Sequence, residues 1–391
     1  MKLRHVAAAG IAAALFVSPV AAGMAQAQAP LAGPMVPAAA PSSQATAAAD
    51  WLAAQWKADP SAFSTGTLAD SIISLAPTGL HADVLAEMDA ALRADAKTYA
   101  TNPGAAGKVA IAAIAVQALG ADPTNYGGVD LIKIIQDGLV SKPDAGGMFN
   151  LPYAVIALVR AGETVPQASI DAFVTAQDAS GAFGYLETWN SPVTFAIDVD
   201  STGVAIAALV GLEASGQGGA AVSTALDKAI TWAASAQQAD GSWPGYSPAN
   251  ATAMVGQGLL AAGLDMSDAI AYLVAQQAKT GGAGLPNSPD GTEPDLMATS
   301  QALLLLAGEN YLDAELQAPP STTAPVSSPA PTTSAPTTSA PTTSTPAATT
   351  TPRPLPSTGT SDDTTLPVVL LAGVATTLVA AGAAARGRRN R

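Results

Sequence analysis

Two kinds of helical segment alternate through the middle of the chain, and this alternation limits the fold more than any other feature of the sequence. SIDAFVTAQ, which begins at Ser169, and DAIAYLVAQ, which begins at Asp268, carry large apolar residues on one helical face. The segments that follow, such as STGVAIAALVGL from Ser201 and ATSQALLLLAG from Ala298, are apolar on nearly every side. A one-sided helix covers a core, whereas an all-apolar helix lies inside one. The alternation therefore predicts two helical layers, one around the other.

This alternation is an internal repeat with six copies. Two of the copies are in register, with Gln177 matching Gln277 and Gly181 matching Gly281. The outer helices are expected to begin near residues 47, 83, 129, 167, 221 and 267. Their inner partners are expected at residues 67–75, 107–119, 151–160, 202–212, 251–262 and 296–306. Because six helical hairpins can close into a ring that leaves no apolar end exposed, the sequence predicts an all-α α6/α6 toroid over residues 46–316.

The N-terminus has the three parts of a secretory signal. Lys2 and Arg4 precede an apolar run over residues 6–17, and the small residues Ala25 and Ala27 frame a cleavage site. We therefore predict a signal peptide over residues 1–27 and a secreted protein. A flexible linker is expected over residues 28–45.

A tract of Pro, Thr, Ser and Ala fills residues 317–354, with APTTS three times in tandem from Ala330. It has few apolar residues larger than Ala, so it cannot form a core. Its prolines favour an extended chain. The tract is therefore predicted to be a disordered stalk that holds the toroid away from whatever carries it.

Residues 355–391 combine LPSTG, a polar spacer, an apolar run and the basic tail RGRRNR. The run, over residues 366–385, is long enough for a transmembrane helix. This order resembles the sorting signal of Gram-positive surface proteins, in which a sortase cuts after the Thr and joins it to peptidoglycan. The resemblance implies sortase and peptidoglycan as partners, the cell wall of a Gram-positive bacterium as the location, and a sorting signal formed by Leu355, Pro356, Ser357, Thr358 and Gly359. The alternative is a plain membrane-anchored protein in which LPSTG arose by chance within the stalk.

Charge and residue types exclude several function classes. Residues 28–358 carry ten Lys and Arg against 28 Asp and Glu, a formal charge of −18. Such a surface repels nucleic acid and anionic lipid, so no nucleic-acid partner is expected. The chain has no Cys, and His81 is the one His outside the signal peptide. Thiol nucleophiles and thiolate metal sites are excluded, no metal or cofactor is expected, and His81 is interpreted as a surface or helix-start residue.

One stretch of the repeat carries a family resemblance. KAITWAASAQQADGSW, from Lys228 to Trp243, resembles the QW repeat of squalene–hopene cyclases and the related protein prenyltransferases. FVTAQDASGAF from Phe173 and YLVAQQAKTGGAG from Tyr272 are weaker copies. In that family the motif ends an outer helix of an α/α toroid and ties it to its neighbours. The resemblance therefore implies the same fold that the repeat predicts.

The stretch AIDVDSTGVAIAALVGL, residues 196–212, holds two carboxylates at the start of a predicted inner helix. Cyclases of the family carry a catalytic Asp-x-Asp-Asp-Thr-Ala there, and the resemblance places Asp200 at the proton donor, with Ser201 replacing the next acid. Asp198, Asp200 and Glu187 are therefore candidate catalytic residues for terpenoid-cyclase-like or glycan-cleaving acid chemistry. In the other interpretation, Asp198 and Asp200 cap the free N–H groups of the helix. The zinc chemistry of the prenyltransferases lacks its Cys and His ligands here.

Aromatic residues gather in turns that are expected to share one end of the ring. The candidate ligand-binding residues among them are Tyr185, Trp189, Trp243 and Tyr246, which suit a glycan or an apolar small molecule. For Trp243 and Phe183 the alternative is packing of the turn against the helix end. We expect a binding or interaction module displayed at the cell surface, with an enzyme as the alternative.

Overall fold

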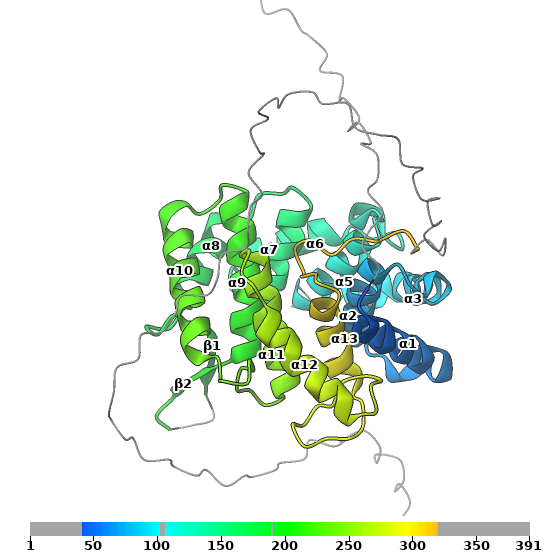
Figure 1. The fold of residues 1–391 in the computed structure, drawn as a ribbon. Helices are drawn as coiled ribbons and strands as arrows, with labels where there is room; N and C mark the ends of the chain where they lie inside the picture. Colours follow the sequence, from blue (N-terminus) through cyan, green and yellow to red (C-terminus); the bar gives the residue numbers. More distant parts are fainter. Residues whose placement is uncertain (1–40, 102–105, 189–190, 320–391) are drawn as a thin grey trace, which may run out of the picture.

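The computed structural model describes residues 41–101, 106–188 and 191–319, and this part of the chain is mostly helical (Figure 1). The predicted signal peptide, sorting signal and membrane-spanning run lie outside the described residues, as does most of the predicted stalk. The expectation of an all-α domain is confirmed for the described part, which adds only two short strands.

Six buried helices form an inner set. They are α2 (Thr65–Leu75), α5 (Ala106–Ala118), α7 (Leu151–Arg160), α9 (Val199–Ala214), α11 (Pro248–Ala261) and α13 (Leu296–Leu306). In chain order each packs against the next, and α13 packs back against α2. The contacts among the inner helices therefore form a closed cycle.

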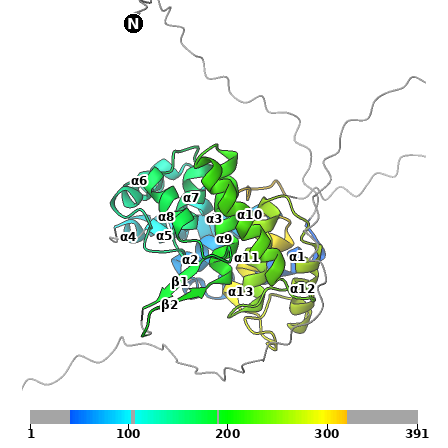
Figure 2. The same cartoon turned by 90° about the vertical axis from the view of Figure 1, so that its left-hand side faces the viewer.

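An outer helix precedes each inner helix in the chain and packs on the inner helix that comes before it in the cycle. The outer helices are α1 (Ser43–Ala58), α3 (Ala82–Ala94), α6 (Leu131–Ser141), α8 (Gln167–Thr175), α10 (Gly219–Ala236) and α12 (Ser267–Lys279). A short extra helix, α4 (Ala96–Ala100), lies between α3 and α5. In Figure 2 the outer helices α6 and α12 lie on opposite sides of the helical body, with α9 between them.

Glycines bring two inner helices into direct backbone contact. A Cβ on Gly203 of α9 would lie 2.3 Å from the carbonyl carbon of Met254 on α11. A Cβ on Gly258 of α11 would lie 2.2 Å from the carbonyl oxygen of Gly203. Any larger residue at either position would force α9 and α11 apart. This contact explains why the all-apolar helices contain Gly as well as Leu and Ile.

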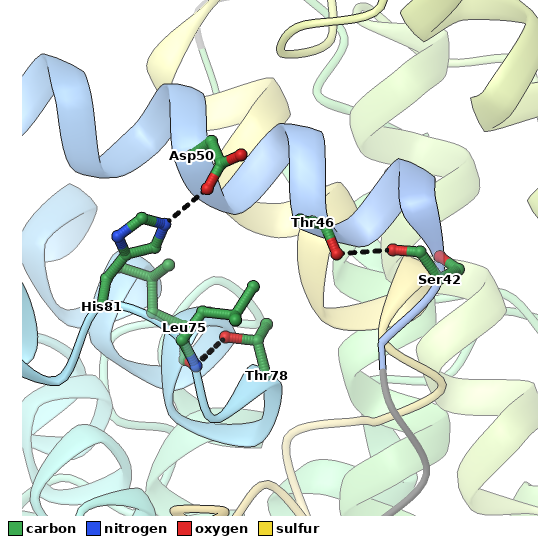
Figure 3. Close-up of polar contacts among 7 residues, drawn as sticks. Ser42, Thr46, Asp50, Leu75, Thr78 and His81 are labelled. Atoms are coloured by element: carbon green, nitrogen blue, oxygen red, sulfur yellow. Dashed lines mark hydrogen bonds and ion pairs between the residues drawn. The ribbon is translucent and has the colours of Figure 1, made fainter. Parts of the chain in front are cut away.

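Polar contacts fix α1 against the turn before α3 (Figure 3). The helix begins at Ser43, ahead of the predicted start of the domain, because the Ser42 hydroxyl accepts a hydrogen bond from the N–H of Ala45. Farther along α1, Asp50 lies 2.8 Å from Nε2 of His81. His81 is the residue before α3 and has a left-handed backbone, with φ of 53°. It is therefore the helix-start residue that the sequence predicted.

Residues 310–317, here called the sealing segment, cross the ends at which the inner helices finish. Arg160, the last residue of α7, donates hydrogen bonds to the carbonyls of Tyr311, at 2.8 Å, and Ala314, at 2.7 Å. Leu312 packs beside Gly211 near the end of α9. The N–H of Gln317 donates to the carbonyl of Ala76, directly after α2. In Figure 1 this segment, in orange, lies on the opposite side of the molecule from the strands.

The two strands form a hairpin that the sequence did not predict. Strand β1 (Gly184–Glu187) pairs antiparallel with β2 (Thr194–Ile197), with Gly184 opposite Ile197. The aromatic and β-branched residues in both strands favour extended backbone. Figures 1 and 2 show the hairpin projecting from the helical body just before α9. Within the described ranges, no helix is both long enough and apolar enough to cross a membrane.

Candidate functional site

The turns that lead into three inner helices share one hydrogen-bonding pattern. A threonine near the start of the helix accepts a hydrogen bond, through its hydroxyl, from the backbone N–H of a buried apolar residue in the preceding turn. The pairs are Thr202 with Phe183 at 2.9 Å, Thr252 with Trp243 at 3.1 Å and Thr299 with Leu285 at 2.8 Å. All six residues are buried. These threonines therefore fix the turns onto the inner layer.

A glutamine near the end of each preceding outer helix holds the same turn from the other side. Its Nε2 donates to a turn carbonyl: Gln177 to Gly181 at 2.9 Å, Gln237 to Gly241 at 3.1 Å and Gln277 to Ala283 at 2.7 Å. The match of Gln177 with Gln277 thus has a physical basis. The match of Gly181 with Gly281 does not, because the third turn is longer and Ala283 takes the equivalent place.

Two of these turns also pack against the next outer helix. A Cβ on Gly181 would lie 2.4 Å from the carbonyl oxygen of Lys228 on α10. A Cβ on Gly241 would lie 2.3 Å from that of Asp268 on α12. Both glycines have positive φ, at 98° and 86°. The QW-like segments therefore tie neighbouring hairpins together, which is a structural role.

Trp243 belongs to this packing. Its side chain is fully buried, and its Nε1–H donates to the carbonyl of Ala233 at 2.7 Å. The indole has no surface for a ligand and no unpaired N–H. The suggestion that Trp243 binds a ligand is therefore corrected, and its packing interpretation fits the structure. Phe183 is buried in the same way, with its ring 5.4 Å from that of Phe173.

Asp198 caps α9. Its Oδ1 accepts a hydrogen bond from the N–H of Ser201 at 2.6 Å, and the residue has the extended backbone of an N-cap. One of the free N–H groups at the helix start is thereby satisfied. The capping interpretation of Asp198 therefore accounts for its position.

Asp200 does not share that role. It lies in the first turn of α9, and within the described residues no N–H donates to its carboxylate. Burial, followed by the charge of Asp198, raises the pKa of Asp200 to about 7. Its Oδ1 lies close to Gly245 in the turn before α11. Asp200 is therefore a half-buried carboxyl that takes up a proton near neutral pH.

Glu187 lies apart from the two aspartates. It sits at the far end of β1, where it pairs with Thr194 and accepts a hydrogen bond from that hydroxyl at 2.8 Å. Thr194 is four residues before Asp198, which along a strand is about 13 Å. A glycosidase carboxylate pair needs a separation of roughly 5–9.5 Å. Glu187 therefore stands at the opposite end of the hairpin from Asp198, and its pairing with the aspartates stays a prediction.

A polar network that the sequence analysis missed fills the middle of the inner helices. The Tyr311 hydroxyl donates to Oδ1 of Asp70 on α2 at 2.7 Å and lies 4.0 Å from the sulfur of Met254 on α11. Its ring packs edge-on against Tyr153 of α7, at 5.4 Å between centroids. Tyr311 therefore contacts three inner helices, α2, α7 and α11, that are not neighbours in the cycle. Its side chain lies at the centre of that cycle.

The interior polar network continues from Asp70 to α13 and α11. Nε2 of Gln301 lies 3.4 Å from Asp70 Oδ2, and Asn250 Nδ2 donates to Gln301 Oε1 at 2.6 Å. Ser247 in turn contacts Asn250. Burial raises the pKa of Asp70 to about 6, although the hydrogen bonds from Tyr311 and Gln301 oppose the shift. Asp70 was visible in the sequence as a lone acid within an apolar inner helix.

One of the aromatic residues predicted to bind a ligand lies at a cleft. Tyr185 lines a cleft of about 690 Å³, here called the aromatic cleft, between the α6–α7 turn, the end of α8 and the hairpin. Phe149, Leu186 and Phe195 also line it, and the rings of Phe149 and Tyr185 are 5.6 Å apart. Tyr246 is fully exposed elsewhere, in the turn before α11. Trp189 lies outside the described residues.

Exposed apolar side chains concentrate at the end where the inner helices begin. Seven of the nine large apolar side chains that are exposed in the described residues precede or begin α7, α9, α11 or α13. These seven, here called the apolar rim, are Phe149, Leu186, Val193, Phe195, Ile197, Tyr246 and Met297. The rim lies at the end of the molecule that carries Asp198, Asp200 and the aromatic cleft.

Comparison with known proteins gives no family. No protein-family model matches the chain, and no curated protein matches it. Among the residues that the structure describes, no group of three or more His, Asp and Glu side chains is placed to hold a metal ion.

Proposed function

We propose that this chain is an exported, wall-anchored surface protein whose helical domain is a binding module. The single observation that carries the binding role is the apolar rim. Monomeric proteins rarely leave large apolar side chains gathered on one face unless that face binds something. Here the rim adjoins a cleft of small-molecule size, and the other end of the inner helices is covered.

The fold proposed for this module is an α6/α6 toroid of the kind found in the squalene–hopene cyclases and protein prenyltransferases. The closed cycle of contacts among the six inner helices supports it, as do the outer helices that alternate with them. The Gln and Thr hydrogen bonds of the QW-like turns add to this support. Circular dichroism should be dominated by helix, with sheet limited to the hairpin.

The wall-anchored location rests on the order of the terminal segments. LPSTG, the apolar run and the basic tail follow the tract of Pro and Thr, and the N-terminus has the parts of a signal peptide. We expect the double change Leu355→Ala and Thr358→Ala to release the protein from the wall fraction. Continued covalent linkage to peptidoglycan in that variant would contradict sorting.

The binding role is tested with the chain of residues 28–358 and isolated cell walls. We expect the protein to sediment with the walls, and the rim variant Leu186→Ser with Ile197→Ser to sediment less. Leu316→Ser is the matched control, because Leu316 is 50 % exposed and Ile197 46 % exposed, but Leu316 lies in the sealing segment. Equal wall binding by all three proteins would remove the apolar rim as the binding surface.

Acid catalysis is the second candidate, and one observation favours it. Asp200 is half-buried at the same end, makes no capping bond within the described residues and has a pKa raised to about 7 by burial. Such a carboxyl holds a proton at neutral pH and is able to donate it. We expect any turnover of squalene or of wall glycan to fall as pH rises through 7. Asp200→Asn should abolish it while leaving the fold intact, because Asp198 is the cap.

A further inference from the structure

The aromatic cleft is a separate site from the acidic residues of α9. Its lining comes from the α6–α7 turn, the last turn of α8 and the hairpin, and it includes neither Asp198 nor Asp200. Its volume of about 690 Å³ lies within the range of roughly 300–1,000 Å³ that is usual for small-molecule sites. A cleft of this volume has room for a ligand of several rings.

One wall of the cleft is aromatic. The ring planes of Phe149 and Tyr185 are tilted by 32° with centroids 5.6 Å apart, so the two rings are in contact at this wall. Phe149 is 56 % exposed, and Phe195 and Leu186 extend the wall from the paired strands. Such a surface suits a flat ligand face that carries C–H groups. The arrangement is a wall rather than a box, so it does not enclose a compact cation on several sides.

The two charged residues that line the cleft are both acidic. Asp144 and Asp178 line it, and no Lys or Arg is among the lining residues that the structure describes. The chain between residues 28 and 358 also carries a formal charge of −18. Phosphate, diphosphate and carboxylate ligands would be repelled without a compensating cation. An isoprenoid diphosphate is therefore a poor fit.

The polar groups of the cleft are oriented hydrogen-bond acceptors. Oδ1 of Asp144 accepts from the N–H of Gly146 at 3.0 Å, and Oδ2 of Asp178 accepts from the N–H of Ser180 at 2.8 Å. These bonds hold both carboxylates in place at the edge of the aromatic wall. Hydrogen bonds from Ser180 also keep the pKa of Asp178 below its usual value. Fixed acceptors of this kind suit a ligand that presents several hydroxyl groups.

We propose that the aromatic cleft binds a neutral oligosaccharide, with a pyranose face against Phe149 and Tyr185 and its hydroxyls donating to Asp144 and Asp178. This inference rests on the proposed binding function and gives it a ligand class and a site. A pyranose ring has a C–H-bearing face that packs against an aromatic wall. Its hydroxyl groups donate hydrogen bonds that the two carboxylates accept. A neutral ligand also meets no repulsion from the acidic surface.

The test uses the chain of residues 28–358 with three neutral probes: triacetylchitotriose, maltotriose and mannotriose. Saturation-transfer NMR and titration calorimetry measure binding. We expect at least one probe to bind, and Phe149→Ala or Tyr185→Ala to weaken that binding at least tenfold. Asp144→Asn should weaken it by a smaller factor. Leu316→Ala is the control and should bind as the wild type does, since Leu316 is 50 % exposed but lies in the sealing segment.

Three results would overturn the proposal. The first is no binding of any of the three sugars, and the second is sugar binding that Phe149→Ala and Tyr185→Ala leave unchanged. The third is tighter binding in the cleft of benzyltrimethylammonium or geranyl diphosphate, which represent cationic and isoprenoid anionic ligands. Wall sedimentation distinguishes failure of the cleft proposal from failure of the proposed function. If the protein binds cell walls but no sugar, the cleft proposal fails and the proposed binding module stands. If it binds a sugar but no cell walls, the cleft proposal stands and the proposed wall binding fails.

Discussion

The two ends of the inner helices are built differently. Where the helices finish, the sealing segment covers them, and its backbone is held by Arg160 and by the carbonyl of Ala76. Where the helices begin, seven large apolar side chains are exposed and Asp200 is left without a capping bond in the described structure. At the first end the chain completes its own packing. At the second end it leaves apolar surface and a titrating acid.

From this contrast we propose that one end serves stability and the other serves binding. Tyr311 carries the sealing segment into the centre of the cycle, where its hydroxyl meets Asp70. Changes at that end should therefore reduce the free energy of unfolding. Changes on the apolar rim should affect partners and leave the fold nearly unchanged, because exposed side chains lose little packing when shortened.

The largest effect is expected at Arg160. Arg160→Met removes two charge-assisted hydrogen bonds to carbonyls of the buried residues Tyr311 and Ala314. Each such bond contributes about 1.5–3 kcal/mol, so we expect a loss of roughly 3–6 kcal/mol. Urea unfolding measures it. Lys133→Met is the control, because Lys133 forms an exposed pair with Asp137 and should change stability by less than about 1 kcal/mol. Equal losses in the two variants would contradict a structural role for the sealed end.

A somewhat smaller effect is expected at Asp70, and it depends on pH. Burial raises the pKa of Asp70 from 3.8 to about 6 in the folded chain. The folded state thus holds this proton more tightly than the unfolded state. The resulting stabilisation is complete below pH 4 and is lost as pH rises through 6.

Asp70→Asn should remove this pH-dependent loss of stability. The variant is expected to gain about 3 kcal/mol relative to the wild type between pH 4 and pH 7. Urea unfolding across this range measures the difference. Asp137→Asn, on the exposed face of α6, serves as the control. A difference between the Asp70 variant and the wild type that stays constant with pH would show that Asp70 does not titrate in the interior polar network.

The smallest effect on stability is expected on the apolar rim. Leu186 is 60 % exposed on the hairpin, so Leu186→Ser should change the free energy of unfolding by less than about 0.5 kcal/mol. The same change should lower wall binding. Thermal unfolding and wall sedimentation measure the two quantities on one sample. A loss above 2 kcal/mol would make Leu186 part of the core and weaken the division between the ends.

The sequence predicted the elements whose causes are local. The all-apolar segments predicted the inner helices. The Thr at the start of α9, α11 and α13 accepts an equivalent hydrogen bond in each repeat. The Asp198 cap was predictable, because Asp198 stands three residues before Ser201, whose N–H donates to its carboxylate.

What the sequence left open depends on long-range contacts. Asp70 and Tyr311 are 241 positions apart, so no local pattern joined them. The sealing segment fell at the predicted border between domain and stalk. The aromatic cleft depends on the α6–α7 turn lying beside the hairpin. The sequence allowed Trp243 either to bind a ligand or to pack inside the fold, and its burial decides between them. Residue types indicated candidates there, but only the packing showed which of them face solvent.

Hydrogen–deuterium exchange with and without isolated cell walls tests the central claim most directly. The account predicts slower exchange on wall binding at the α6–α7 turn, at the hairpin and at the turn before α11. It predicts no change in residues 310–317, which lie at the opposite end of the inner helices (Figure 1). Protection confined to the sealing segment, with the hairpin and these turns unaffected, would contradict the assignment of binding to the end where the inner helices begin.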